Sequence, residues 1–366
     1  MPPGLSFVRH INFYYSNSNM IFKKLSLLSL SLLALASCTG GKSNNPDSTA
    51  TASSTLTGAG STFINPIMTH WASEYPKDGG MAVNYQSVGS GAGINNLIDH
   101  TVDFAGSDAP MNQAELDRAK APVIHIPAVI GAVCVAYHIK GIETGLKLSG
   151  AVISGIFQSK ITYWDDAQIK KLNAGMKLPH EKIFTVHRSD GSGTTAIFTD
   201  YLSKADPEWK TKVGQGKTVN WPEGGLGGKG NAGVAEVLTQ HDNSIGYVEL
   251  AYAAQNKITY ASVQNVSGNF IAPSVESASA AAEGFPMPEN MTSFITNTPA
   301  AQGYPITGFS WIITYKDSPK ADMVKKFIAW ATTKGQADSK DLYYAPLPAS
   351  VASAIAAQLG PTQAAK

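Results

Sequence analysis

Three stretches of the chain place small glycine, serine and threonine residues directly in front of a run with the hydrophobic period of a helix. These stretches are residues 58–63, 89–93 and 188–195. The first backbone N–H groups of a helix have no partner within the helix and carry a partial positive charge, so such junctions suit a phosphate, sulfate or carboxylate group. We therefore expect the three junctions to face one shared anion.

The third junction also carries side chains that match an oxyanion. Arg188 offers a planar fork of donors, and Asp190 can hold that fork in place. Ser192 and Thr194 add hydroxyls, and Gly193 and Thr194 add backbone amides. The alternative is a capped helix with an ion pair on the surface. The segment is not a nucleotide P-loop, because no lysine precedes its last hydroxyl residue.

Asp108 follows a predicted strand over residues 104–107. A carboxylate beside an anion repels it unless the anion carries a proton that the carboxylate can accept. Inorganic phosphate carries such a proton near neutral pH, whereas sulfate does not, so one buried aspartate can admit the first and reject the second. The alternative for Asp108 is a cap of the turn before Pro110.

The composition narrows the class of protein. The chain has 366 residues, of which 43% are hydrophobic and 15% charged, which is enough for one large or two ordinary domains. The 28 Lys and Arg residues nearly balance the 27 Asp and Glu residues, so nothing favours nucleic acid as a partner. The histidines lack the helical zinc spacing and no paired thiols occur, so we expect neither a metal site nor a cofactor.

The N-terminal region has the features of an export signal. Residues 20–38 contain two lysines and then an apolar stretch that is too short to span a bilayer. Small residues lead into Cys38, which is typical of a lipoprotein signal with a lipidated cysteine; the alternative is an ordinary signal peptide. We interpret residues 1–19 as an upstream extension that is not native, and residues 39–55 as a flexible linker.

From residue 56 onward, β-branched and aromatic runs alternate with helical patterns, which indicates an α/β architecture with open sheets. Ligands of such sheets bind beyond the carboxyl ends of the strands. Helices are predicted over 65–75, 94–99 and 194–203, the first with Asn65 as its cap. Residues 223–233 are rich in glycine and predict a surface loop, which either closes over a ligand or merely connects two elements. The predicted strands span 83–88, 104–107, 124–129, 133–139, 183–187, 244–248 and 310–315.

Four segments read together closely resemble the PstS family, the substrate-binding proteins of high-affinity phosphate ABC importers. They are LTGAGSTF at 56–63, YQSVGSG at 85–91, VDFAGSDAP at 102–110 and RSDGSGT at 188–194. The resemblance extends from residue 56 to about residue 350. Several motifs that match in order are far more specific than any one of them.

This resemblance implies a type II periplasmic-binding-protein fold, in which two α/β lobes joined by hinge crossovers close on phosphate in a cleft. Lobe I would comprise residues 56–137 and 309–366, and lobe II residues 138–308. Asp190 would orient Arg188. The implied phosphate ligands are Thr62, Phe63 through its backbone amide, Ser90, Asp108, Arg188, Ser192, Gly193 and Thr194.

We therefore expect a binding protein and not an enzyme. It would be a periplasmic monomer, anchored to a membrane through Cys38, that delivers phosphate to a permease driven by a separate ATPase. One alternative is a secreted phosphatase or hydrolase with Ser192 or Ser90 as its nucleophile, although no nucleophile elbow is evident. Another alternative is a binding protein of the same fold whose ligand is sulfate, molybdate or a phosphonate.

Overall fold

The computed structural model describes residues 55–360. The predicted upstream extension, the predicted signal peptide with Cys38 and all but the last residue of the predicted linker lie outside this range. The two lobes described below belong to one compact unit. Among residues 55–360, no helix combines the length and the apolar character needed to cross a membrane.

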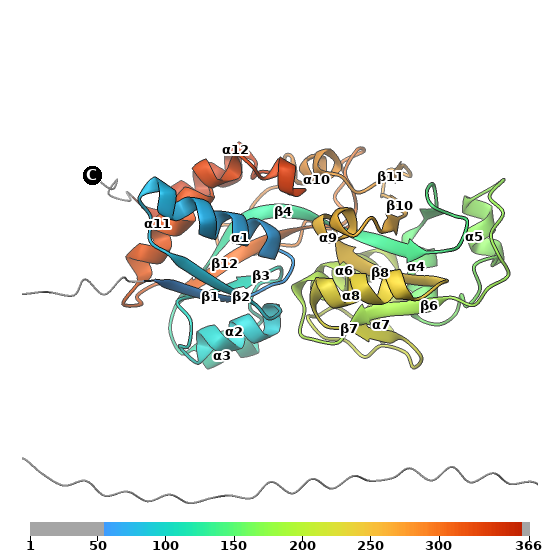
Figure 1. Cartoon of the computed structure of the whole chain (residues 1–366), viewed down its shortest axis with the longest axis horizontal. Helices are drawn as coiled ribbons and strands as arrows, with labels where there is room; N and C mark the ends of the chain where they lie inside the picture. Colours follow the sequence, from blue (N-terminus) through green and yellow to red (C-terminus); the bar gives the residue numbers. More distant parts are fainter. Residues whose placement is uncertain (1–54, 361–366) are drawn as a thin grey trace, which may run out of the picture. The chain divides into compact units, whose positions relative to one another are not determined.

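The two lobes are built on the same strand topology. In lobe I the order is β2-β1-β3-β12-β4, and in lobe II it is β7-β6-β8-β4 with β9 also paired to β4. In each lobe the first three strands are parallel, and the last two pairings are antiparallel. Together with the family likeness reported below, this arrangement confirms the predicted type II fold of two α/β lobes (Figure 1).

The strands of the main sheets are β1 (Leu56–Gly60), β2 (Val83–Ser87), β3 (Phe104–Ser107), β4 (Val123–His138), β6 (Phe184–Arg188), β7 (Leu226–Gly228), β8 (Ser244–Glu249), β9 (Thr259–Tyr260) and β12 (Thr307–Tyr315). A small separate sheet contains β5 (Lys147–Leu148), β10 (Ser262–Gln264) and β11 (Phe270–Ile271).

The helices are α1 (Asn65–Glu74), α2 (Ser90–Ile98), α3 (Gln113–Ala119), α4 (Gly150–Phe157), α5 (Ala167–Leu172), α6 (Gly193–Ala205), α7 (Pro207–Lys212), α8 (Gly230–Gln240), α9 (Leu250–Gln255), α10 (Val275–Ala282), α11 (Ala321–Ala331) and α12 (Ala349–Leu359). Short 3-10 helices span Tyr75–Asp78, Lys334–Gln336 and Lys340–Leu342. Helices α1, α2 and α11 pack on the sheet of lobe I, and α6 and α8 pack on that of lobe II.

Strand β4 belongs to both lobes and carries the chain between them. It pairs with β12 as far as Ala132 and with β8 from Val133 onward. The returning chain runs beside the same point, because the Val133 N–H donates to the Ile306 carbonyl at 2.8 Å. The sequence predicted two separate strands here, but the almost fully buried β4 is continuous. The predicted lobe boundary after Tyr137 remains a prediction.

The helix predicted over residues 65–75 is found as α1, which begins at Asn65, but its predicted cap and the predicted starts of two other helices are wrong. Asn65 does not cap α1, because Ile64 occupies the N-cap position and Asn65 is the first helical residue. Helix α2 begins at Ser90, four residues before the predicted start at residue 94, so most of the small residues of this junction lie inside the helix. Helix α6 begins at Gly193 with Ser192 as its cap, one residue before the prediction.

Candidate functional site

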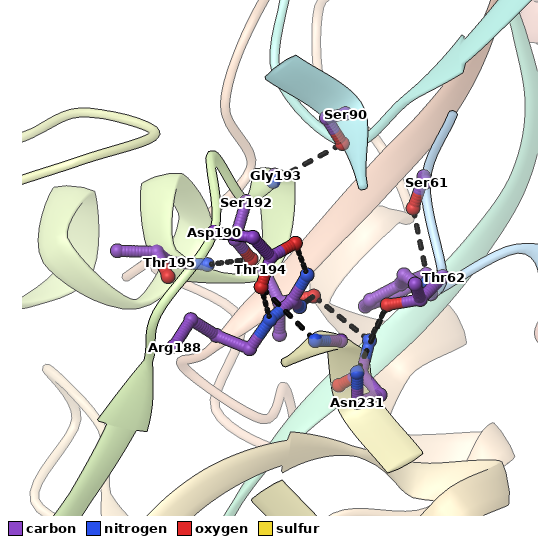
Figure 2. A network of polar contacts seen from close by, with 12 residues as sticks. Ser61, Thr62, Ser90, Arg188, Asp190, Ser192, Gly193, Thr194, Thr195 and Asn231 are labelled. Carbon is purple, nitrogen blue, oxygen red and sulfur yellow. Dashed lines mark hydrogen bonds and ion pairs between the residues drawn. The ribbon is translucent and has the colours of Figure 1, made fainter. Parts of the chain in front are cut away.

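The site lies at the carboxyl ends of the three parallel strands of each lobe, and Figure 2 shows residues of both lobes that meet there. Each of these strands ends at, or is followed closely by, a polar residue. Residues Ser61 and Thr62 follow β1, Ser90 follows β2, Asp108 follows β3, Arg188 ends β6, Asn231 follows β7 and Glu249 ends β8. The structure thus brings the three predicted junctions together at the sheet edges where open α/β sheets bind their ligands.

Arg188 is fixed in the interior by Asp190. Its Nε and Nη2 atoms donate to the two carboxylate oxygens at 2.7 and 2.5 Å, and only 1% of the Arg188 side chain is exposed. Burial alone would raise the pKa of Asp190, but the hydrogen bonds and charge of Arg188 outweigh it and lower that pKa. The Gly230 N–H also donates to Asp190, at 3.0 Å. The alternative of a surface ion pair is therefore wrong.

Asp108 is buried among hydroxyl groups. The Ser61 hydroxyl lies 2.6 and 2.7 Å from its two oxygens, and Ser310 on β12 donates to Oδ1 at 2.7 Å. Burial raises its pKa to about 6, although the hydrogen bonds from Ser61 and Ser310 and the charge of Arg188 act in the opposite direction. Pro110 has no N–H and the Met111 amide donates to His125 Nε2, so Asp108 caps neither a turn nor a helix there.

Three hydroxyl oxygens of the site each accept two N–H groups. Ser90 Oγ accepts from the amides of Gly193 at 3.1 Å and Asp108 at 3.4 Å. Thr62 Oγ1 accepts from the backbone N and the Nδ2 of Asn231, and Thr194 Oγ1 accepts from Arg188 Nη1 and Asn231 Nδ2. With both lone pairs engaged, each hydroxyl can approach a ligand only as a donor. Such a set of donors suits a ligand rich in acceptor oxygens.

The remaining predicted ligands lie in the same network but have partners within the protein. The Phe63 amide donates to Ser61 Oγ at 2.9 Å. Ser192 Oγ accepts from the Thr195 amide at 3.0 Å and so caps α6. All eight predicted residues and Asp190 thus gather in one place, while their roles as ligands stay a prediction.

The lobes are closed on each other in this structure. The Gly91 amide of lobe I donates to the Gly191 carbonyl of lobe II at 2.9 Å. A largely buried ion pair of 2.7 Å joins Lys217 of lobe II to Glu115 of lobe I. Cavities of about 710 and 340 Å³ flank the seam, the larger lined by both residues of this ion pair and the smaller by Asp190.

Sequence reasoning missed several residues of this network. Ser61 lies in the first junction but was not singled out, and Ser310 lies within a strand where no local signal distinguishes it. Residues 223–233 are not a plain loop, because they contain β7 and the start of α8 with the buried Asn231. The local signal that could have identified Asn231 is a polar residue directly after a glycine at a helix start. Among residues 55–360, no group of His, Cys, Asp and Glu side chains could hold a metal ion.

Two lobes of one topology that close on a buried set of hydrogen-bond donors define a substrate-binding protein of the periplasmic-binding class. In agreement, residues 45–334 match the family model described as a PBP superfamily domain. The chain is 46% identical over 314 residues to the phosphate-binding protein PstS of Pasteurella multocida, covering 84% of this chain and 90% of the relative. The PstS protein of Xylella fastidiosa is 42% identical over 324 residues, covering 87% and 88%.

The chain therefore belongs to the PstS family. A solved structure of a phosphate binding protein from Stenotrophomonas maltophilia has the same fold, with a TM-score of 0.65 at 19% identity and coverage of 83% of this chain and 93% of the other. The family consists of binding proteins, so the expectation that this chain is not an enzyme is confirmed. Ser90 and Ser192, the nucleophiles of the enzyme alternative, are instead engaged by backbone amides.

Proposed function

We propose that this protein binds inorganic phosphate between its lobes and delivers it to the permease of an ABC-type phosphate importer. One observation carries the proposal: hydroxyl and amide groups from both lobes form one hydrogen-bonded network around the buried carboxylate of Asp108. The donors match the oxygens of an oxyanion, and the carboxylate matches a proton on it. The names of the relatives, which are phosphate-binding proteins, agree with this ligand.

Asp108 supplies the selectivity in this proposal. Its ionised carboxylate accepts a hydrogen bond from protonated phosphate, whereas sulfate would leave two acceptors facing each other. An unpaired buried group of this kind costs roughly 1 to 3 kcal/mol, which corresponds to selectivity of about fivefold to 150-fold. The hydroxyls of Ser61 and Ser310 hold the carboxylate in place for this role.

The proposed ligands are Thr62, Phe63, Ser90, Asp108, Arg188, Ser192, Gly193 and Thr194. The Phe63 amide, which now donates to the Ser61 hydroxyl, would turn to an oxygen of phosphate, and the Gly193 amide would donate to phosphate as well as to Ser90. Arg188 would add the positive charge, and closure of the lobes would form the surface that the permease recognises. The predicted export signal and Cys38 support a periplasmic protein held to a membrane by a lipid, and we propose that it acts as a monomer.

The D108N variant tests this proposal against binding of sulfate or another fully ionised oxyanion. Calorimetric titrations at about pH 7.5 would give the ratio of the Kd for sulfate to the Kd for phosphate. We expect D108N to lower this ratio at least about tenfold, because the introduced side-chain amide can donate to sulfate. The matched control is D103N, whose parent carboxylate bonds to Thr57 and Lys320 outside the site. An unchanged ratio in D108N would contradict the proposed role of Asp108.

A further inference from the structure

Asn231 lies at the point where α8 meets lobe I. It is the second residue of α8 and is completely buried. The preceding Gly230 has a φ of +68°, and a Cβ there would lie 3.1 Å from Thr62 Cγ2, so glycine permits both the turn and the close approach. The chain thereby brings the Asn231 side chain into the seam between the lobes.

The orientation of the Asn231 amide is fixed by its surroundings. The Glu249 backbone N–H, which can only donate, lies 3.0 Å from one end of the amide, so this end must be the oxygen. The other end is therefore the NH₂ group. It lies 2.8 Å from Thr62 Oγ1 in lobe I and 3.1 Å from Thr194 Oγ1 in lobe II (Figure 2).

These bonds decide what the two threonine hydroxyls can do. Thr62 Oγ1 receives a second N–H from the Asn231 backbone at 3.0 Å, and Thr194 Oγ1 receives one from Arg188 at 3.3 Å. Each oxygen has two lone pairs, so its own hydrogen must be given to a further acceptor. Without the Asn231 side chain, one lone pair of each hydroxyl would be free, and the hydroxyl could turn to accept.

We propose that Asn231 is a positioning residue that holds the Thr62 and Thr194 hydroxyls as donors toward the bound anion and ties the lobes together when they close. This inference rests on the proposed function, because the anion is the phosphate proposed above. It adds to the eight proposed ligands a residue that touches no ligand itself. Its loss acts on the two hydroxyls and on the closed state, so the bound phosphate should leave faster.

The test is a double-mutant cycle between Asn231 and Thr62, with phosphate affinity and dissociation rate as readouts. N231D keeps the shape and the acceptor for Glu249 but replaces the NH₂ group by an acceptor, which draws the Thr62 hydroxyl away from the ligand. T62V removes that hydroxyl, and T62S is the matched control that keeps it. We expect N231D to weaken phosphate binding about 30-fold or more in the wild-type and T62S backgrounds, mainly through faster dissociation. With T62V the loss should fall to about sixfold or less, because only the effect through Thr194 remains.

The cycle separates this role from general damage. Repulsion by a new carboxylate, or a loss of folding, would cost the same affinity whether or not residue 62 carries a hydroxyl. An equal cost of N231D in all three backgrounds, or none in any, therefore overturns the inference while the proposed function stands. A wild-type protein that binds no phosphate overturns the proposed function and this inference with it. Thermal unfolding of each variant without phosphate shows whether it is folded.

Discussion

The contact between Gly193 and lobe I gives a sharp prediction about closure of the lobes. A Cβ added at Gly193 would lie 2.6 Å from the Asp108 amide nitrogen, from Asp108 Oδ2 and from Ser90 Oγ. Ordinary contacts of a Cβ begin at 3.4 Å, so the lobes must separate by about 0.8 Å to admit a methyl group. The 3.1 Å bond from the Gly193 amide to Ser90 would then exceed hydrogen-bonding distance.

The G193A variant should therefore bind phosphate far more weakly. The loss of two or three hydrogen bonds at the seam corresponds to roughly 2 to 4 kcal/mol, or about 30-fold to 1,000-fold in affinity. The ligand-free protein should remain stable, because open lobes avoid the clash and alanine is favoured over glycine in a helix. Calorimetry gives the affinity, and small-angle X-ray scattering with saturating phosphate shows whether the lobes close.

The matched control is G227A in β7. Its new Cβ would lie 3.3 Å from Ser189 Cβ, within the same lobe, so closure is unaffected. We expect its phosphate affinity to stay within about threefold of the wild type, since its neighbour needs to move only slightly. If G193A also binds phosphate within about threefold of the wild type, closure of the lobes does not depend on the approach of Gly193 to Asp108 and Ser90.

The charged groups of the site give three further predictions. Because burial raises the Asp108 pKa from 3.8 to about 6, the carboxyl becomes protonated as the pH falls through 6 and can then donate to sulfate. Calorimetry should therefore show sulfate affinity rising by up to about tenfold per pH unit as the pH falls toward 6, and levelling off below it, in the wild type but not in D108N. A flat wild-type profile would contradict this assignment. Because the pKa of Asp108 is raised in the folded protein, its protonated carboxyl stabilises the folded, ligand-free state. This contribution to the free energy of unfolding is present at low pH and is lost as the pH rises through 6. The Lys217–Glu115 pair joins the lobes only when they close, so K217M should speed phosphate release several-fold in stopped-flow measurements. The charge-swapped double variant K217E/E115K should restore part of the loss. Equal release rates in K217M and the wild type would exclude a role of this ion pair in closure. D190A removes the partner of the buried Arg188, so it should weaken phosphate binding and lower the free energy of unfolding by about 3 to 5 kcal/mol in urea titrations. An unchanged free energy of unfolding would mean that Arg188 finds another partner.

Local patterns predicted much of the fold. The strands at Phe104–Ser107 and Val83–Ser87 were placed to within one residue, and in the second the alternation of Val83 and Tyr85 with polar residues is a strong local signal. The start of α2 was misplaced because glycine and serine discouraged a helix that tertiary contacts stabilise. The continuity of β4 was missed, since only its pairing with two different sheets explains so long a buried strand.

The candidate site was predictable to the extent that it is built from helix starts. The motif around Arg188 identified its partner Asp190 correctly, because both lie within three residues. Ser310 and Asn231 could not be placed in the same way. Each reaches its partner, Asp108 or Thr62, only across many residues of sequence, and such long-range contacts leave no mark on the local pattern.

The proposed function requires that the donors of both lobes and the buried carboxylate of Asp108 select inorganic phosphate. The most direct measurement is calorimetry on the purified protein at about pH 7.5, after retained ligand has been removed by partial unfolding and refolding, with phosphate and then sulfate as titrants. We expect the protein to bind one phosphate per chain with a Kd of about 1 μM or lower, and the titration with sulfate to show no heat of binding. Equally tight binding of sulfate would leave the fold intact and contradict the proposed function.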